Sequence, residues 1–189
     1  MKKTAKILSV IVIISILGVV AVSKAVTPLD SAKPIDKPGL PNFYQVSEFL
    51  YRGAQPTSEG FQQLDKMGIK TVISLRHFHS DKELIKGLSL QYEPIPFNTW
   101  NPKEEYVVKF IDIVKDKNNH PIFVHCQHGA DRTGTMIAIY RIVFEDWDTE
   151  KAIKEMTEGP FGYHSIWTHL PPYIRSLDIE KYKKMIEDK

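Results

Sequence analysis

Short runs of apolar and β-branched residues alternate along most of the chain with longer segments in which apolar residues recur at helical spacing. The short runs predict strands, of which the clearest are Thr71–Leu75, Leu90–Pro96 and Pro121–His125. The longer segments predict helices over Pro56–Met67, Lys103–Lys115, Thr133–Phe144, Asp148–Met156 and Ile179–Glu187. Alternating strands and helices are typical of a parallel sheet with helical crossovers. We therefore expect an α/β fold in which a single domain has a central, mainly parallel sheet flanked by helices.

The N-terminal segment has a different pattern. Lys2, Lys3 and Lys6 precede an uncharged apolar run, Ile7–Val22, and Ser23–Ala25 then resembles a small-x-small cleavage site. This arrangement resembles a secretory signal peptide. The run is shorter than the roughly 20 residues of a typical membrane-spanning helix, and an uncleaved membrane anchor over residues 7–22 is the alternative. In both cases we expect an exported protein, with the rest of the chain in the periplasm or another extracytoplasmic space.

Three parts of the chain follow from these patterns. Residues 1–25 are the signal peptide or N-terminal anchor. Residues 26–42 carry four prolines and little apolar periodicity, which predicts an extended tether. Residues 43–189 form the domain, whose length suits one α/β core and not two.

Charge and cysteine usage narrow the function further. The whole chain has a formal net charge of +2. With the four lysines of residues 1–25 set aside, 21 of the 25 basic residues remain against all 23 acidic ones. The domain thus gives no electrostatic reason to expect nucleic acid as a partner.

The single cysteine cannot form an internal disulfide, so reactivity explains its presence in an oxidising compartment better than structure does, although oxidation becomes a hazard.

That cysteine lies in the stretch His125–Gly134, which reads HCQHGADRTG. Cys126 ends a predicted strand and is followed by a tight loop and a helix, whose N–H groups and dipole favour a thiolate and bind anions. Arg132 adds a planar fork of donors that matches phosphate oxygens. A lone cysteine is often only a small buried hydrophobe. Here Gly129, Arg132 and Thr133 all fall where a phosphate-binding loop needs them, which favours a nucleophile.

The residues of this loop resemble a known signature. His125-Cys126, five intervening residues, Arg132 and Thr133 are similar to the loop of the cysteine-dependent protein tyrosine and dual-specificity phosphatases. The resemblance extends over roughly residues 43–175, where the sequence is similar to exported bacterial members of the TpbA type. The other segments that carry it are Phe49–Pro56, Thr71–Leu75, Tyr140–Trp147 and Ala152–Gly162. The expected fold is therefore dual-specificity phosphatase-like.

The resemblance implies a role for each matching residue. Cys126 would be the nucleophile, Arg132 the phosphate clamp, and Thr133 the hydroxyl that meets the departing cysteine. His125 would orient the loop and hold the thiolate. The phosphate would lie against the backbone amides of Gln127, His128, Gly129, Ala130, Asp131 and Arg132. The implied scheme runs through a phosphocysteine that water hydrolyses, and it needs no metal and no other cofactor.

The general acid departs from the family pattern. An aspartate usually lies on a loop before the helix that precedes the signature strand, but residues 95–105 contain none, and Trp100 falls at about that place. Asp131 is our first candidate, because it directly precedes Arg132 as in the similar signature of the myotubularins, where a loop aspartate has been proposed as the acid. The alternative for Asp131 is a structural carboxylate bonded to loop amides or to Arg132. Glu104 and Glu105 are the other candidates, and we expect them in the exposed first turn of a helix.

Two further segments are candidates for the rim of the site. His77, His79 and Asp81 follow a predicted strand; we expect an active-site loop there, which we favour over a metal site. The turn-rich segment Gly159–His164 either borders the site or is a loop packed by aromatic side chains. Tyr51 and Arg52 are expected to support structure.

The sequence leaves several functions open. The first is hydrolysis of phosphotyrosine, or of both phosphotyrosine and phosphoserine or phosphothreonine, with a phosphorylated protein or a small phosphomonoester as substrate. A phosphoinositide or inositol phosphate substrate is the main variant. A catalytically weak phosphoprotein-binding module remains an alternative because the loop aspartate is missing. A thiol-redox or sulfur-transfer enzyme would also place a cysteine at the end of a strand, but that function would not explain the presence of Arg132.

Overall fold

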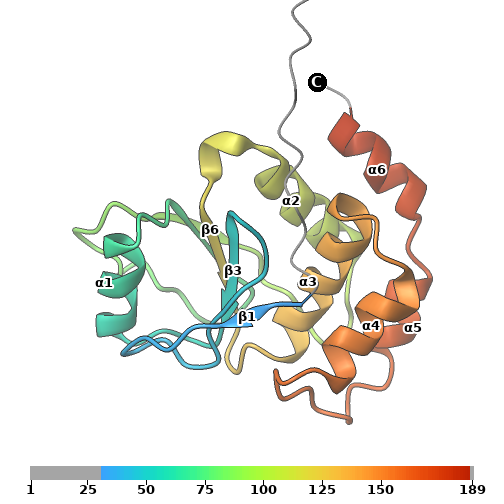
Figure 1. Cartoon of the computed structure of the whole chain (residues 1–189), viewed down its shortest axis with the longest axis horizontal. Coiled ribbons are helices and arrows are strands. Elements are labelled where there is room, and N and C mark those ends of the chain that lie inside the picture. The colour runs from blue at the N-terminus through green and yellow to red at the C-terminus, as the bar shows by residue number, and fades with distance from the viewer. Residues whose placement is uncertain (1–30, 188–189) are drawn as a thin grey trace, which may run out of the picture.

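The computed structural model describes residues 31–187, which form a six-stranded sheet with helices on both sides (Figure 1). The order of strands is β1-β2-β3-β6-β4-β5, and β3, β6, β4 and β5 run parallel. The strands are β1 (Lys33–Pro34), β2 (Tyr44–Gln45), β3 (Leu50–Gly53), β4 (Thr71–Ser74), β5 (Gln91–Pro94) and β6 (Ile122–His125). The predicted α/β fold with a mainly parallel sheet is confirmed.

The helices cover the two faces of the sheet unequally. Figure 1 shows α1 on one side, and α2 to α6 on the other. The helices are α1 (Ser58–Lys66), α2 (Glu104–Lys115), α3 (Asp131–Phe144), α4 (Thr149–Glu158), α5 (Leu170–Arg175) and α6 (Ile179–Glu187), with a 3-10 turn at Lys117–Asn119. Alternate side chains of each strand serve the two faces: Val72 and Phe123 belong to the cluster around α1, whereas Ile73 and Val124 belong to the larger core.

Helix α3 differs from the amphipathic helix predicted over Thr133–Phe144. It begins two residues earlier, at Asp131, and all its residues except Arg132 and Phe144 are buried. The reason is that α4, α5 and α6 cover its outer side, where Ala138 and Ile142 pack with residues of α4. A helix that is enclosed on all sides has no need of a polar face. The predicted helix is therefore confirmed, but its predicted amphipathic character is wrong.

The N-terminal part of the described chain packs closely against the domain. Ala32 and Leu40 are buried, and β1 pairs with β2 in the antiparallel sense. Residues 32–42 are therefore part of the folded unit, and the extended segment predicted over residues 26–42 does not act there as a free tether. The predicted signal segment, residues 1–25, lies outside the described residues. Within residues 31–187, no helix is both long and apolar enough to cross a membrane.

The register of the strands brings the ends of β3, β4 and β6 together at one edge of the sheet. Gly53 at the end of β3 and Ser74 at the end of β4 both lie opposite His125, the last residue of β6. The carboxyl ends of these parallel strands thus meet at one edge, which is where open α/β sheets bind ligands. Cys126 is the first residue beyond that edge.

Candidate active site

Residues outside the loop between β6 and α3 hold it in place by donating hydrogen bonds to its backbone carbonyl groups. Three of them accept hydrogen bonds from residues of the neighbouring strand and loops: Gln55 N to Gln127 O (3.2 Å), Asn42 Nδ2 to His128 O (2.8 Å) and Arg52 Nη2 to Gly129 O (2.7 Å). In a planar trans peptide the N–H points opposite to the C=O. The N–H groups of residues 128–130 therefore point toward the inside of the loop.

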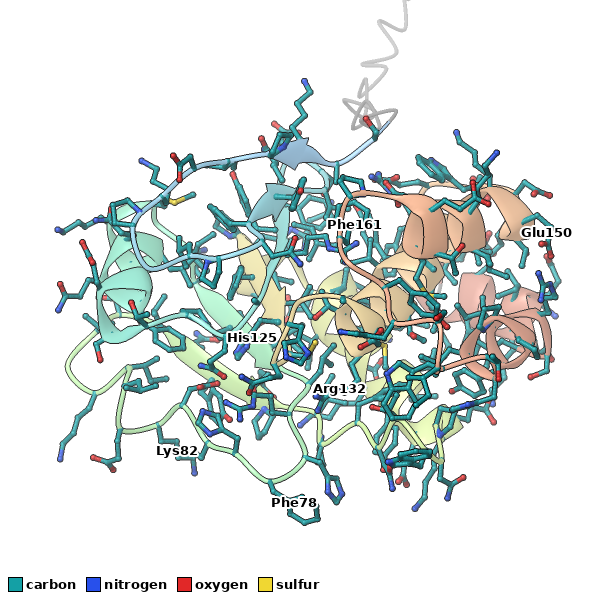
Figure 2. The ribbon with its side chains drawn as sticks, turned by 90° about the horizontal axis from the view of Figure 1, so that it is seen from below. Phe78, Lys82, His125, Arg132, Glu150 and Phe161 are labelled. Atoms are coloured by element: carbon teal, nitrogen blue, oxygen red, sulfur yellow. The ribbon has the colours of Figure 1, made fainter. Side chains whose placement is uncertain are left out.

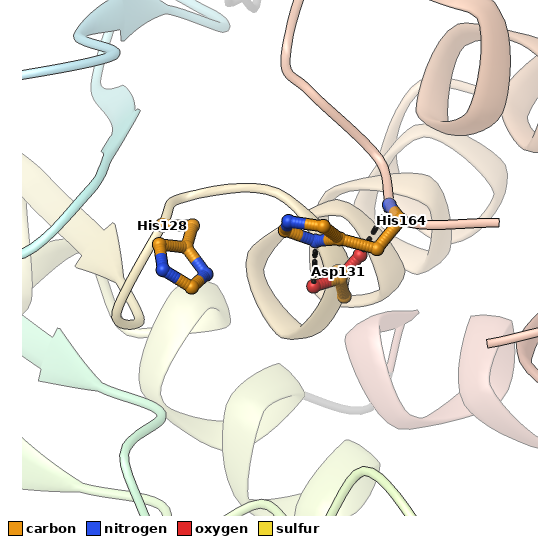
Figure 3. Close-up of side chains that lie close together, drawn as sticks. All are labelled: His128, Asp131 and His164. Atoms are coloured by element: carbon orange, nitrogen blue, oxygen red, sulfur yellow. Dashed lines mark hydrogen bonds and ion pairs between the residues drawn. The ribbon is translucent and has the colours of Figure 1, made fainter. Parts of the chain in front are cut away.

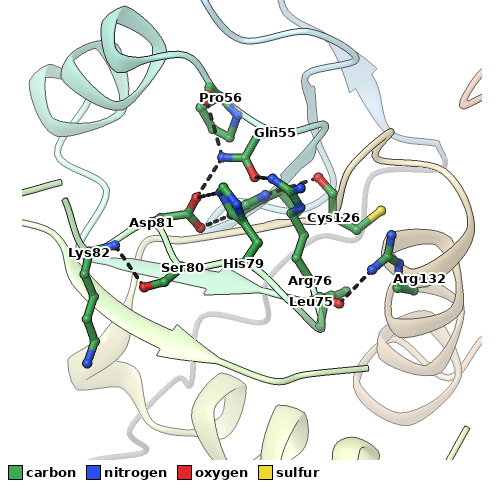
Figure 4. A network of polar contacts seen from close by, with 11 residues as sticks. Gln55, Pro56, Leu75, Arg76, His79, Ser80, Asp81, Lys82, Cys126 and Arg132 are labelled. Carbon is green, nitrogen blue, oxygen red and sulfur yellow. Dashed lines mark hydrogen bonds and ion pairs between the residues drawn. The ribbon is translucent and has the colours of Figure 1, made fainter. Parts of the chain in front are cut away.

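Within residues 31–187, the backbone N–H groups of residues 127–130 donate no hydrogen bond. Successive unpaired N–H groups at the start of a helix form an anion-binding concavity. Cys126, the only cysteine of the chain, directly precedes this loop; the residue is 2% exposed and its thiol points toward Arg132 (Figure 4).

Gly129 is required by the path of the loop. Its φ is +72°, and a Cβ at this position would lie only 2.5 Å from the carbonyl carbon of Gly53. The loop can approach β3 this closely because glycine has no side chain and tolerates positive φ. The sequence identified Gly129 as a loop residue, and the structure gives the physical reason.

Arg132 and Thr133 follow in the first turn of α3. Arg132 is partly exposed at the open side of the loop, and its Nη1 lies 3.4 Å from the carbonyl oxygen of Leu75. Figure 2 shows it near the middle of one face of the molecule, and Figure 4 shows it on the side toward which the Cys126 thiol points. Thr133 is fully buried, and its hydroxyl has no hydrogen-bond partner among residues 31–187.

A cleft of about 360 Å³ opens next to Arg132. Aromatic side chains dominate its lining, which consists of His77, Phe78, Phe97, Asn98, Thr99, Trp100, Arg132 and Trp167. The Trp100 and Trp167 rings meet edge to face with centroids 4.6 Å apart. Phe78 is 95% exposed and points away from the body of the protein (Figure 2). Trp100, which takes the place expected for the family aspartate, thus forms part of an apolar rim.

Behind the loop, His125 is fixed by a buried carboxylate. Its Nε2 donates to Asp81 Oδ2 at 3.1 Å, and Asp81 Oδ1 accepts from Gln55 Nε2 at 2.7 Å and from His79 Nε2 at 3.1 Å (Figure 4). Burial would raise the pKa of Asp81, but the hydrogen bonds from His125 and Gln55 outweigh it and lower the pKa to about 2. Asp81 and His79 therefore support the loop, as part of the expected active-site segment.

Arg52 is a second buried support. Its side chain is enclosed, its guanidinium lies 3.7 Å above the Phe161 ring, and burial lowers its pKa to about 10. The bond from its Nη2 to Gly129 joins β3 to the loop. The structural role expected for Arg52 is thus specific: it holds the loop between β6 and α3 in place.

Asp131 is held by the segment that follows α4. Its Oδ1 accepts from the backbone N–H of His164, and its Oδ2 lies 2.8 Å from the ring Nδ1 of the same residue (Figure 3). Neither loop amides nor Arg132, the structural partners considered from the sequence, bind this carboxylate. The Gly159–His164 segment therefore borders the site, and His164 is a neighbour that the sequence did not indicate.

The glutamate candidates face elsewhere. Both lie in the exposed first turn of α2, as expected. Glu104 accepts from Lys181 Nζ at 2.6 Å and from the Tyr182 hydroxyl at 3.0 Å, both on α6. Glu105 pairs with Lys103 Nζ at 3.4 Å. Of the three candidate acids, Asp131 alone lies at this loop, and both of its carboxylate oxygens contact His164.

The fold and these residues define the class of the cysteine-dependent phosphatases. Residues 36–166 match the family described as DSP-PTPase phosphatase fused to NAD+ kinase. The chain belongs to this DSP-PTPase phosphatase family.

Relatives and solved structures agree. The dual specificity protein phosphatase TpbA of Pseudomonas aeruginosa (strain UCBPP-PA14) is 29% identical over 140 residues, which cover 74% of this chain and 64% of that relative. The part of this chain that matches therefore spans less than two thirds of the length of TpbA. A crystal structure of P. aeruginosa TpbA superposes with a TM-score of 0.74 at 27% identity and covers 84% of this chain and 97% of that one. Inositol diphosphatase DSP5 of Arabidopsis thaliana is 27% identical over 128 residues, 61% of this chain and 60% of that protein.

Proposed function

We propose that this chain hydrolyses phosphomonoesters through a phosphocysteine formed on Cys126. The observation that carries the proposal is the loop after Cys126. Its backbone N–H groups at residues 127–130 have no hydrogen-bond partner within residues 31–187, and Arg132 lies in the first turn of the helix that follows. Phosphoryl transfer places negative charge on the equatorial oxygens, so catalysis depends mainly on positioning and on electrostatic stabilisation. Loop amides and a planar guanidinium supply both.

The first step transfers the phosphoryl group to sulfur. The Cys126 thiolate attacks phosphorus, an S–P bond forms, and the O–P bond to the leaving group breaks. Asp131, protonated at this stage, gives its proton to the departing oxygen. The backbone amides and Arg132 hold the three equatorial oxygens throughout.

The second step regenerates the thiol site. Water attacks phosphorus, Asp131 takes a proton from it, and the S–P bond breaks to release phosphate. The Thr133 hydroxyl, which is buried and has no partner within residues 31–187, is free to donate to the departing sulfur. His125, fixed by Asp81, keeps the loop in shape.

The cleft favours an aromatic leaving group. Trp100, Trp167 and Phe97 line it next to Arg132, and an aryl ring stacks well on such side chains. Phosphotyrosine in proteins is therefore the first substrate we propose, with phosphoserine and phosphothreonine as further substrates. A TpbA crystal structure, 26% identical with a TM-score of 0.74, contains pTyr.

Inositol phosphates are the second candidate. The relationship to inositol diphosphatase DSP5 favours them. A substrate with several phosphates requires several cations, and the cleft lining offers Arg132 and His77. A direct comparison of the two substrate classes separates these proposals.

One assay tests the function itself. The full-length chain should release phosphate from para-nitrophenyl phosphate, and Cys126→Ser should abolish this release. Parallel assays with phosphotyrosine and phosphoserine peptides and with inositol phosphates then rank the substrates. Tight phosphopeptide binding without phosphate release would instead identify a binding module.

We also propose that the domain works outside the cytoplasm, either released after cleavage or anchored by residues 7–22. The support is the lysine-flanked apolar run Ile7–Val22 with its small-x-small sequence. Fractionation of cells that express the full-length chain tests this: activity should lie in the periplasmic or membrane fraction. Activity confined to the cytoplasmic fraction would contradict it.

A further inference from the structure

We infer that His128, Asp131 and His164 form a binding site for one divalent transition-metal ion of the Zn²⁺ type at the edge of the phosphate-binding loop. The three residues come from the loop, from the first turn of α3 and from the segment after α4 (Figure 3). One potential ligand atom of each lies within 4.8 Å of the others. The site does not include the Cys126 thiol, but it shares Asp131 with the phosphoryl transfer proposed above.

The donor set suits this class of ion. Two imidazole nitrogens and one carboxylate oxygen are the ligands of many zinc sites in which a fourth position is left to water. His128 and His164 are exposed, so an ion can reach them from solvent, whereas Asp131 is buried. The buried carboxylate of Asp131 is therefore a fixed ligand, whereas the exposed rings of His128 and His164 can adjust their positions around an ion.

The pair of Asp131 and His164 already has nearly the required spacing. Oδ2 and Nδ1 lie 2.8 Å apart. Two ligand atoms on a tetrahedral zinc, at bond lengths of about 2.0–2.1 Å, are separated by roughly 3.3 Å. An ion can therefore take the place of the hydrogen between Oδ2 and Nδ1 if these two atoms move apart only slightly. The exposed ring of His128 can then rotate to become the third ligand.

Contacts around the three residues hold the site in place. The backbone N–H of His164 donates to the other oxygen of Asp131 at 2.8 Å, which fixes the plane of the carboxylate. Asn42 Nδ2 donates to the backbone carbonyl oxygen of His128 and thereby holds the backbone at that position. The same amide donates at 2.9 Å to the carbonyl oxygen of Phe161, in the segment that leads to His164. Such outer contacts orient metal ligands and contribute to affinity.

The consequence for activity rests on the proposed function. An ion on Asp131 withdraws the carboxylate from proton transfer, so zinc should inhibit most strongly on substrates with a poor leaving group. The Cys126 thiolate is itself a ligand for zinc. Metal binding must therefore be measured in a chain that lacks this thiol.

The test is calorimetric titration of Zn²⁺ into the full-length Cys126→Ser chain in a buffer without phosphate. We expect one bound ion per chain. Adding His164→Gln, His128→Gln or Asp131→Asn should weaken binding at least tenfold, whereas His77→Gln, a change to an exposed histidine on another loop, should leave it unchanged. Thermal unfolding of each variant establishes that it is folded.

Binding is read here without catalysis, so the result is independent of whether the chain hydrolyses phosphate esters. Failure of the Cys126→Ser chain to bind Zn²⁺ would overturn the inference. The same holds if folded variants of all three residues bind as tightly as the Cys126→Ser parent.

Discussion

Arg52 and Gly129 lie 77 residues apart in the chain, yet Arg52 Nη2 donates to the Gly129 carbonyl oxygen at 2.7 Å in the interior of the protein. The bond joins the end of β3 to the loop around Cys126. Because a carbonyl that points outward directs the next N–H inward, Arg52 helps to set the direction of the amides that are proposed to bind phosphate.

Replacement of Arg52 by Met should therefore affect both stability and activity. Leaving the buried Gly129 carbonyl without a partner costs about 1–3 kcal/mol of unfolding free energy, and we expect kcat/KM to fall at least tenfold as the loop loses its support. Urea unfolding and initial rates on para-nitrophenyl phosphate measure the two effects. Arg175→Met is the matched control, since Arg175 pairs with Glu150 on the surface and such pairs contribute little. Equal effects of the two changes would contradict the role of Arg52.

Asp81 makes stability depend on acidity. Its pKa is lowered from 3.8 to about 2 in the folded protein, so its contribution is complete above the unfolded-state pKa and is lost as the pH falls through about 2. The shift corresponds to about 2 kcal/mol. Asp81→Asn should thus lose about this much unfolding free energy at pH 7, and the difference from the parent should narrow below about pH 4.

Urea unfolding at a series of pH values measures this difference. Asp112→Asn is the control, because Asp112 pairs with Lys115 at the surface, where its side chain is 49% exposed. A destabilisation by Asp81→Asn that stayed constant down to pH 3 would show that the carboxylate charge is not the cause.

The strand-loop-helix pattern around Cys126 was predictable because neighbouring residues determine it. Apolar runs located three of the four parallel strands, β4, β5 and β6, but not β3. The spacing of Cys126, Gly129 and Arg132 located the loop between β6 and α3. The short strands β1 and β2 were missed, since two residues carry no periodicity. Helix α3 was predicted, but its enclosure was not, because α4, α5 and α6, which follow it in the chain, cover its outer side.

The partners of the loop could not be predicted for the same reason. Asp81 reaches His125 across 44 positions, and His164 reaches Asp131 across 33. Spacing within a short motif contains no information about contacts of this kind. The clusters of turn residues near both partners indicated loops, and only the packed fold shows which loop faces which residue.

Asp131→Asn tests the proton donor. A poor leaving group needs the proton more than a good one does, so kcat on phenyl phosphate should fall at least tenfold further than kcat on para-nitrophenyl phosphate. Glu105→Gln should change neither, because Glu105 is exposed and pairs with Lys103. Equal losses on the two substrates would remove Asp131 from this role.

The aromatic rim should determine substrate preference. Trp100→Ala and Trp167→Ala each remove one ring of an edge-to-face pair beside Arg132. We expect KM for phosphotyrosine peptides to rise about three- to tenfold, in line with about 0.5–1.5 kcal/mol for an aromatic contact, and KM for inositol phosphates to change less. Ile166→Ala, at an exposed position beside Trp167, is the control. A larger effect on inositol phosphates would favour them as the substrates of the cleft.

The most direct test of the account is chemical trapping of the intermediate. The full-length chain is mixed with a radiolabelled phosphotyrosine peptide, quenched in acid within the first turnover, digested and analysed by mass spectrometry. The account predicts a labelled phosphoryl group on the sulfur of Cys126, and no label in the Cys126→Ser chain. Phosphate release at the full rate by Cys126→Ser, or a phosphoryl group on any other residue, would contradict it.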